Sequence, residues 1–190
     1  MKKFTILSEF IFLILFCNSI HSQDIKNFGT KGVWELGGTV YYSNTTTISN
    51  DLIGGKYGIF QIQPVAGYFV RKGLELGIQP SITISNQYGH SNTDMSLYFA
   101  PAYNMISSGK IFPALVALIG YTSHKSDYPE NTSLGGFSWG FQLDAKINLL
   151  GNSLLVVSLQ YVQTTLNAPG ATSRSGGNTL TFGAGWNVFF

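Results

Sequence analysis

Apolar and polar residues alternate along most of this chain. Over residues 137–147, Phe137, Trp139 and Phe141 occupy odd positions, and small or polar residues occupy the even positions. Residues 180–190 show the same alternation, and only Phe189 breaks it. A period of two places successive side chains on opposite faces of an extended chain. Both segments are therefore predicted to be β-strands with one apolar and one polar face.

Six further segments show the same pattern with varying regularity. They span residues 34–42, 60–70, 74–85, 96–105, 112–121 and 155–162. The segment 112–121 is apolar on both faces, so the sequence does not assign its sides. Each of the eight segments has about the length of 9–11 residues that a tilted strand needs to cross a bilayer.

The connections between these segments alternate in length. Residues 71–73, 107–110 and 148–152 form short turns, whereas 44–55, 86–94, 122–135 and 166–178 form longer loops rich in Ser, Thr, Asn and Gly. In an antiparallel arrangement all short turns then lie at one end and all long loops at the other. This layout predicts an all-β fold, an eight-stranded antiparallel up-and-down transmembrane β-barrel.

Side-chain volume indicates which face of the barrel points outward. The apolar face carries Trp34, Trp139 and Trp186, whereas glycines such as Gly67 and Gly140 lie on the polar face. The interior of an eight-stranded barrel is only just wide enough for side chains. We therefore expect the apolar face to point outward, where a bilayer rather than water would cover it.

Aromatic residues gather near both ends of the predicted strands. Trp34, Tyr68 and Tyr103 lie near the short turns, and Tyr42 and Trp139 lie near the long loops. Amphipathic aromatic rings favour the two interfaces of a membrane. These five residues are predicted to mark the two interfaces.

The N-terminal segment has the composition of a secretory signal peptide. Lys2 and Lys3 precede an apolar run over residues 10–16, and small polar residues follow. This predicts a cleaved segment 1–22 and a barrel domain 23–190, with cleavage after Ser19 as the alternative. Cys17, the one cysteine, would leave with this peptide, so no disulfide is expected. A charged fraction of only 11% and a net charge of +2 argue against disorder and nucleic-acid binding.

With these features the chain resembles the small OmpA/OmpX-like outer-membrane β-barrel proteins of Gram-negative bacteria. The resemblance covers nearly all of the chain after residue 22. The last residues, with Phe182, Trp186, Val188 and Phe190 at alternate positions, look like the insertion signal of that class. The resemblance implies localisation in the outer membrane, contact with its lipid, and recognition by the barrel-assembly machinery and periplasmic chaperones.

Four charged residues are predicted to point into the barrel in its turn-end half: Glu35, Glu75, Asp144 and Lys146. A buried charge requires a partner, and three carboxyls share one ammonium. We therefore expect at least one carboxyl to have a raised pKa or to bind a water molecule. A polar cluster that fills and stiffens the barrel is the plain interpretation, and a gate or proton path is the more specific one.

Other candidate chemistry in the sequence is weak. His90 and Ser91 are adjacent in a loop, unlike the His-x-Ser spacing on the lipid-facing wall of outer-membrane deacylases. His90, His124, Asp94, Asp127 and Glu130 show no metal-ligand spacing. Gly32-Val33-Trp34 matches the short Gly-x-Trp signature of lipocalins, but the polar inner face opposes that fold.

The sequence thus favours a monomeric, non-enzymatic membrane anchor and envelope component without cofactor or metal. Its loops, which carry Tyr88, Tyr128 and Arg174, are expected to meet an unidentified external ligand. The alternatives are a conduit for small or apolar solutes, a lipid-modifying enzyme, and a secreted lipocalin-like barrel.

Overall fold

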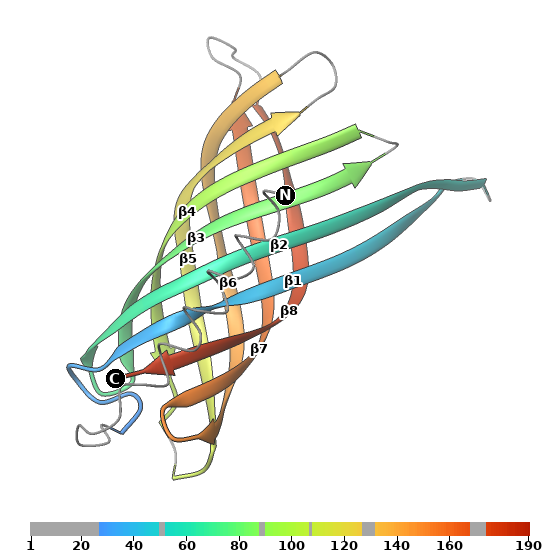
Figure 1. Ribbon diagram of the computed structural model, residues 1–190. Helices are drawn as coiled ribbons and strands as arrows, with labels where there is room; N and C mark the ends of the chain where they lie inside the picture. The colour runs from blue at the N-terminus through green and yellow to red at the C-terminus, as the bar shows by residue number, and fades with distance from the viewer. Residues whose placement is uncertain (1–26, 50–51, 88–89, 107, 127–131, 168–173) are drawn as a thin grey trace, which may run out of the picture.

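A computed structural model describes residues 27–190 except 50–51, 88–89, 107, 127–131 and 168–173 (Figure 1). The predicted signal peptide, Tyr88 and Tyr128 lie outside the described residues. The described chain forms eight strands, β1 (Trp34–Ser49), β2 (Leu52–Arg71), β3 (Leu74–Gln87), β4 (His90–Asn104), β5 (Ile111–Ser126), β6 (Thr132–Leu150), β7 (Ser153–Asn167) and β8 (Arg174–Phe189). Each strand pairs antiparallel with its sequence neighbours.

Pairing between the first and last strands closes the barrel. The register of β1 with β8 runs from the pair Glu35 and Phe189 to the pair Tyr42 and Phe182. Over this span every strand has two hydrogen-bonded neighbours and the barrel has no free edge, whereas from Ser43 onward β1 pairs with β2 alone. The predicted fold class, a closed eight-stranded antiparallel up-and-down barrel, is confirmed.

The strands are longer than the sequence pattern predicted. They span 14 to 20 residues rather than about 9–11. The predicted loop 44–55 is largely a continuation of β1 and β2, in which Asn44 pairs with Gly58 and Ser49 with Leu52. The predicted loops 86–94, 122–135 and 166–178 are shortened in the same way. In these extensions the backbone ladder continues although the alternation of apolar and polar residues in the sequence has ended.

The short turns at the opposite end are where the sequence predicted them. Gly73 between β2 and β3 has a φ of 75°, and Gly151 between β6 and β7 has a φ of 55°. This left-handed region favours glycine because a Cβ is crowded there. The β4–β5 connection spans the residues between Asn104 and Ile111.

The apolar faces of the strands point outward, as predicted. Trp34 is 47% exposed and Phe182 is 62% exposed, and large apolar side chains are exposed on every strand. The structure also assigns the faces of β5, where Phe112, Ala114, Val116 and Leu118 point inward and the alternating residues, such as Leu115 and Ile119, point outward. No helix among the described residues is long and apolar enough to cross a membrane.

Small residues face the interior because the interior leaves no room for larger ones. A Cβ added at Gly67 would overlap the carboxylate of Glu75. A Cβ added at Gly140 or Gly136 would overlap a backbone oxygen of β7. At Gly67 the filled lumen leaves no room for a side chain, as predicted, whereas at Gly136 and Gly140 the close approach of the β7 backbone excludes one.

An apolar plug closes the turn end of the barrel, which the sequence analysis did not predict. Phe28 packs below the strands, with its ring 5.2 Å from Phe69, 5.0 Å from Phe112 and 5.4 Å from Phe189. Val33, Leu154 and Val156 complete this cluster of buried side chains. Phe189 therefore follows the inward and outward alternation of β8, and the expectation of a polar inner face is wrong at this end.

Two prolines interrupt the ladder between β2 and β3. Pairing runs through Ile62 with Ile82 and resumes at Ala66 with Ile78. Pro64 and Pro80 lie in this gap, where each lacks the N–H that a ladder requires. Inside the barrel at the same height, the Gln63 side-chain amide donates a hydrogen bond to Gln79 Oε1. This side-chain bond joins the two strands where the backbone does not.

Candidate functional site in the barrel interior

The inward side chains form layers along the barrel. Above the apolar plug lies a charged cluster, followed by a layer of glutamines and a group of hydroxyls near the loop end. An apolar patch on β4 and β5, which runs from Ala102 and Val116 to Tyr98 and Leu118, lies beside the charged cluster and the glutamines. Each layer draws side chains from several strands because alternate residues of neighbouring strands meet at the same height.

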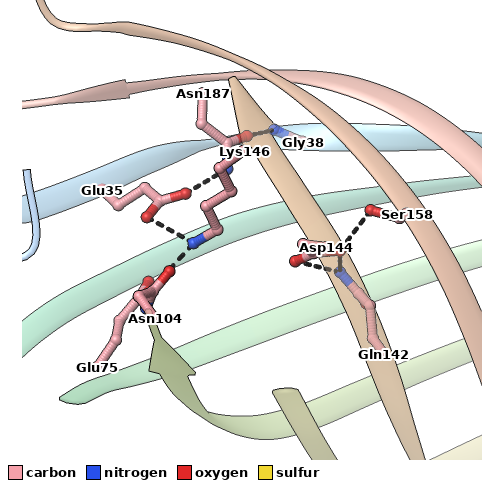
Figure 2. Close-up of polar contacts among 9 residues, drawn as sticks. All are labelled: Glu35, Gly38, Glu75, Asn104, Gln142, Asp144, Lys146, Ser158 and Asn187. Atoms are coloured by element: carbon pink, nitrogen blue, oxygen red, sulfur yellow. Dashed lines mark hydrogen bonds and ion pairs between the residues drawn. The ribbon is translucent and has the colours of Figure 1, made fainter. Parts of the chain in front are cut away.

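A buried lysine holds two buried glutamates at the centre of the charged cluster (Figure 2). Lys146 Nζ on β6 donates to Glu35 Oε2 on β1 at 2.8 Å and to Glu75 Oε2 on β3 at 3.3 Å. The three side chains are at most 4% exposed. Lys146 Nζ also lies 5.4 Å from the centroid of the Phe28 ring, which adds a cation–π contact to the plug.

Two asparagines complete the shell around the glutamates. Asn187 Nδ2 donates to Glu35 Oε1 at 2.5 Å, and Asn104 Nδ2 donates to Glu75 Oε2 at 2.9 Å. Asn187 Oδ1 in turn accepts from the Gly38 N–H at 3.1 Å. Both asparagines occupy polar positions of alternating segments, but the sequence does not connect them to the glutamates, because their common height depends on barrel register.

Asp144 lies outside this cluster, although the sequence grouped it with the other three charges. Ser158 Oγ donates to Asp144 Oδ1 at 2.6 Å, and Gln142 Nε2 donates to its two oxygens at 2.9 and 3.0 Å. Figure 2 shows Asp144 turned toward Ser158 and Gln142 rather than toward Lys146. The predicted cluster is thus one triad, Glu35, Glu75 and Lys146, and one separately bonded carboxyl.

A network of five glutamines spans the middle of the lumen. Gln160 Nε2 donates to Gln63 Oε1 at 2.8 Å and to Gln142 Oε1 at 3.1 Å. Gln61 Nε2 donates to Gln63 Oε1 at 2.8 Å and to Gln160 Oε1 at 3.1 Å. With the Gln63–Gln79 bond, this network joins β2, β3, β6 and β7 across the interior.

Little space remains among these layers. A cavity of about 10 Å³ lies between the charged cluster and the glutamines, with Thr39, Glu75 and Gln79 in its lining. That volume corresponds to about one water molecule. At this height the lumen holds packed side chains, and the cavity between them admits about one water molecule.

Hydroxyls and one histidine–aspartate pair occupy the loop end of the interior. Ser96 Oγ and Thr122 Oγ1 are 2.8 Å apart, and Thr122 Oγ1 and Ser138 Oγ are 2.6 Å apart. His124 Nδ1 lies 2.5 Å from Asp94 Oδ1 on the neighbouring strand. No group of three or more metal-ligating side chains occurs in the described part of the chain, where neither Asp127 nor Glu130 is included.

His90 and Ser91, which the sequence analysis set apart from the deacylase pattern, lie at the start of β4. The backbone of His90 begins β4 and pairs with Gln87, while its side chain lies outside the description. Ser91 pairs with Asn86 on β3. The His124–Asp94 pair faces the lumen, away from the apolar outer wall that a lipid chain would approach.

The predicted interface aromatics lie on the outer surface. Trp34 and Tyr68 are paired across β1 and β2 with ring centroids 5.0 Å apart, and Trp34 N donates to Phe190 O. Tyr103, Tyr42 and Trp139 are also exposed. The side chains predicted as an insertion signal, Phe182, Trp186, Val188 and Phe190, lie on the outward face of β8 and the residue that follows it.

Comparison with known proteins identifies the fold. The structure matches Neisserial surface protein A with a TM-score of 0.63 and 14% sequence identity, covering 84% of this chain and 98% of that chain. It matches the outer membrane protein OprG from Pseudomonas aeruginosa with a TM-score of 0.56 and 11% identity, covering 88% and 99%. No protein-family model matches the sequence, and neither does any curated protein. The chain thus has the fold of small outer-membrane β-barrels.

Proposed function

We propose that this chain is a non-enzymatic outer-membrane β-barrel that serves as a membrane anchor and envelope component. One observation carries the proposal, namely that a closed barrel presents large apolar side chains outward on all eight strands. In water such a surface far exceeds the apolar patches of soluble monomers. In a bilayer these apolar side chains contact the hydrocarbon chains of the lipid, and closure of the barrel provides the strands with backbone hydrogen-bond partners.

The layered interior supports an anchor rather than a conduit. The apolar plug around Phe28, the Lys146 cluster and the glutamine network lie one above another across the lumen. A small-solute path would have to displace several buried, mutually hydrogen-bonded side chains. A lipocalin-like carrier would instead need an apolar cup inside and a polar outer wall, which is the reverse of this barrel.

The partners follow from the same proposal. Outer-membrane lipid would contact the outward apolar belt, and the outward side chains of β8 would be the surface met by the barrel-assembly machinery. Periplasmic chaperones would cover the apolar strands before insertion. The long hairpins at the loop end would be available for binding or adhesion, with the monomer as the functional unit.

Gel mobility tests the membrane-barrel proposal directly. The chain is refolded into phosphatidylcholine vesicles, and boiled and unboiled samples are compared by electrophoresis in dodecyl sulfate. A closed membrane barrel resists unfolding until heated, so the two samples should migrate differently. Equal mobility, together with solubility of the native chain in plain buffer, would contradict the proposal.

Planar-bilayer recording separates the anchor from the conduit. The proposal expects no resolved single-channel current from the inserted protein at neutral pH. Reproducible unit conductance would contradict the closed-lumen interpretation while leaving the membrane location intact.

A further inference from the structure

Among the described residues, the charged side chains exposed at the turn end of the barrel are all positive. Lys31, Arg71, Lys72 and Lys110 are all exposed at this end. Glu35, Glu75 and Asp144, the acidic residues nearest to it in the described chain, are buried inside. None of the four cations forms an ion pair with another described residue. We call these four residues the basic rim.

Backbone hydrogen bonds join the segments that carry the basic rim. Gly73 N donates to Gly29 O at 2.8 Å, which ties the β2–β3 turn to the segment before β1. Asn104 N donates to Gly73 O at 2.7 Å, and Asn148 N donates to Lys110 O at 2.7 Å. The four cations therefore belong to one hydrogen-bonded surface at the turn end.

The basic rim lies just beyond the aromatic residues of the outer wall. Arg71 follows Tyr68 by three residues, which corresponds to roughly 10 Å along a strand and about 7 Å along the axis of a tilted barrel. The headgroup region on each side of the hydrocarbon core is roughly 5–8 Å thick. If the aromatic rings lie at the interface, the cations lie at the height of the lipid phosphates.

We propose that the basic rim binds the phosphate groups of anionic phospholipids in the leaflet next to the short turns, and so holds this end of the barrel at that leaflet. The proposal rests on the membrane location proposed above. A Lys or Arg near an anionic membrane surface contributes about 1 kcal/mol, or about fivefold in partitioning. Four such residues, with no exposed acidic side chain beside them in the described part of the chain, would give a clear preference for anionic over zwitterionic lipid.

Cations that bind a lipid phosphate could equally bind a free phosphate ion. Lys72 lines a hollow of about 440 Å³ below the plug, together with Asn27, Thr30, Ser108 and Asn148. A soluble phosphate held there would need Lys72 but not the other three cations. The leaflet interpretation is favoured because Lys31, Arg71 and Lys110 are not part of the hollow's lining.

The test measures lipid preference at the surface of the inserted barrel. The full chain is refolded into phosphatidylcholine vesicles that contain spin-labelled phosphatidylglycerol or spin-labelled phosphatidylcholine, and the motionally restricted fraction gives the relative association constant of each lipid. The test variant replaces all four cations with glutamine (K31Q/R71Q/K72Q/K110Q). The matched control is Lys125→Gln, an exposed lysine on β5 toward the loop end.

We expect at least a fivefold preference of the unmodified protein for phosphatidylglycerol, weakened by added salt. The preference should approach one in the quadruple variant and persist in the Lys125→Gln control. Equal association of both lipids with the unmodified protein would overturn the proposal, as would a quadruple variant that retains the preference. Loss of the preference on adding sodium phosphate at constant ionic strength, reproduced by Lys72→Gln alone, would identify a free-anion site instead.

The heat-dependent gel shift, measured on every sample, separates the two proposals. A protein that inserts without lipid preference overturns only the role of the basic rim. A protein that fails to insert in any vesicle overturns the membrane location and the rim proposal with it.

Discussion

Lys146 is the single side chain on which the charged cluster depends. Its ammonium contacts both Glu35 and Glu75, and it approaches the Phe28 ring of the plug. Replacement by methionine keeps most of the volume but removes the positive charge. The two carboxylates would then face each other in a buried site with only asparagine amides as donors.

The expected loss of stability follows from leaving buried charges without their partner. Removal of one member of a buried ion pair typically costs about 3–5 kcal/mol, a large part of a total stability of roughly 5–15 kcal/mol. We expect Lys146→Met to lower the free energy of unfolding by about that amount. Replacing a whole buried charge group by neutral residues is often nearly neutral. The triple variant E35Q/E75Q/K146M should therefore recover most of the loss.

Urea unfolding in detergent micelles, followed by the fluorescence of the 3 tryptophans, provides the assay. Lys125→Met is the control, because this exposed lysine should change stability by less than about 0.5 kcal/mol. A Lys146→Met variant within about 1 kcal/mol of the unmodified protein would refute the reasoning. A triple variant as unstable as the single variant would also refute it, because the loss of stability would then come from altered packing rather than from buried carboxylates without a cation.

Three further predictions concern the packing of the interior. Gly140→Ala should lower the free energy of unfolding by about 1–3 kcal/mol, because the added Cβ would lie 2.0 Å from the Tyr161 backbone oxygen. Gly177→Ala, where the added Cβ meets open space, should be nearly neutral in the same urea assay. Phe28→Ala should cost about 3 kcal/mol yet leave planar bilayers without current, because the glutamine network still fills the lumen; an open channel would contradict this. Gln79→Ala should speed backbone amide hydrogen exchange about fivefold beside the gap in β2–β3 pairing, and leave exchange between β7 and β8 unchanged. An equal change at both pairs of strands would contradict the role of the Gln63–Gln79 side-chain bond.

Much of the architecture was predictable because the physical signal is local. Alternation over 137–147 and 180–190 directly encodes which side chains share a face. Short turns containing Gly73 and Gly151 are predictable because few residues tolerate their left-handed backbone. The outward orientation of the tryptophans followed from volume alone, since a narrow lumen cannot hold them.

Strand length and the faces of β5 were not predictable from the pattern. Outside the bilayer neither face of a hairpin requires apolar side chains. The pairing of residues 44–49 with β2 is therefore not accompanied by alternating apolar and polar residues that would predict it. Over 112–121 both faces are apolar for different reasons. Leu115 and Ile119 belong to the outer wall, whereas Phe112 and Leu118 pack inside the barrel.

The sequence by itself determined the number and order of the strands, the end at which each turn lies, and which residue types face outward. These properties depend on neighbours along the chain and on the narrowness of an eight-stranded lumen. Only the tertiary structure decided that Lys146 joins Glu35 and Glu75 rather than Asp144, and that Phe28 seals the turn end against Phe189. Those contacts join residues far apart in sequence, and their heights are fixed by the stagger between paired strands, which hydropathy does not encode.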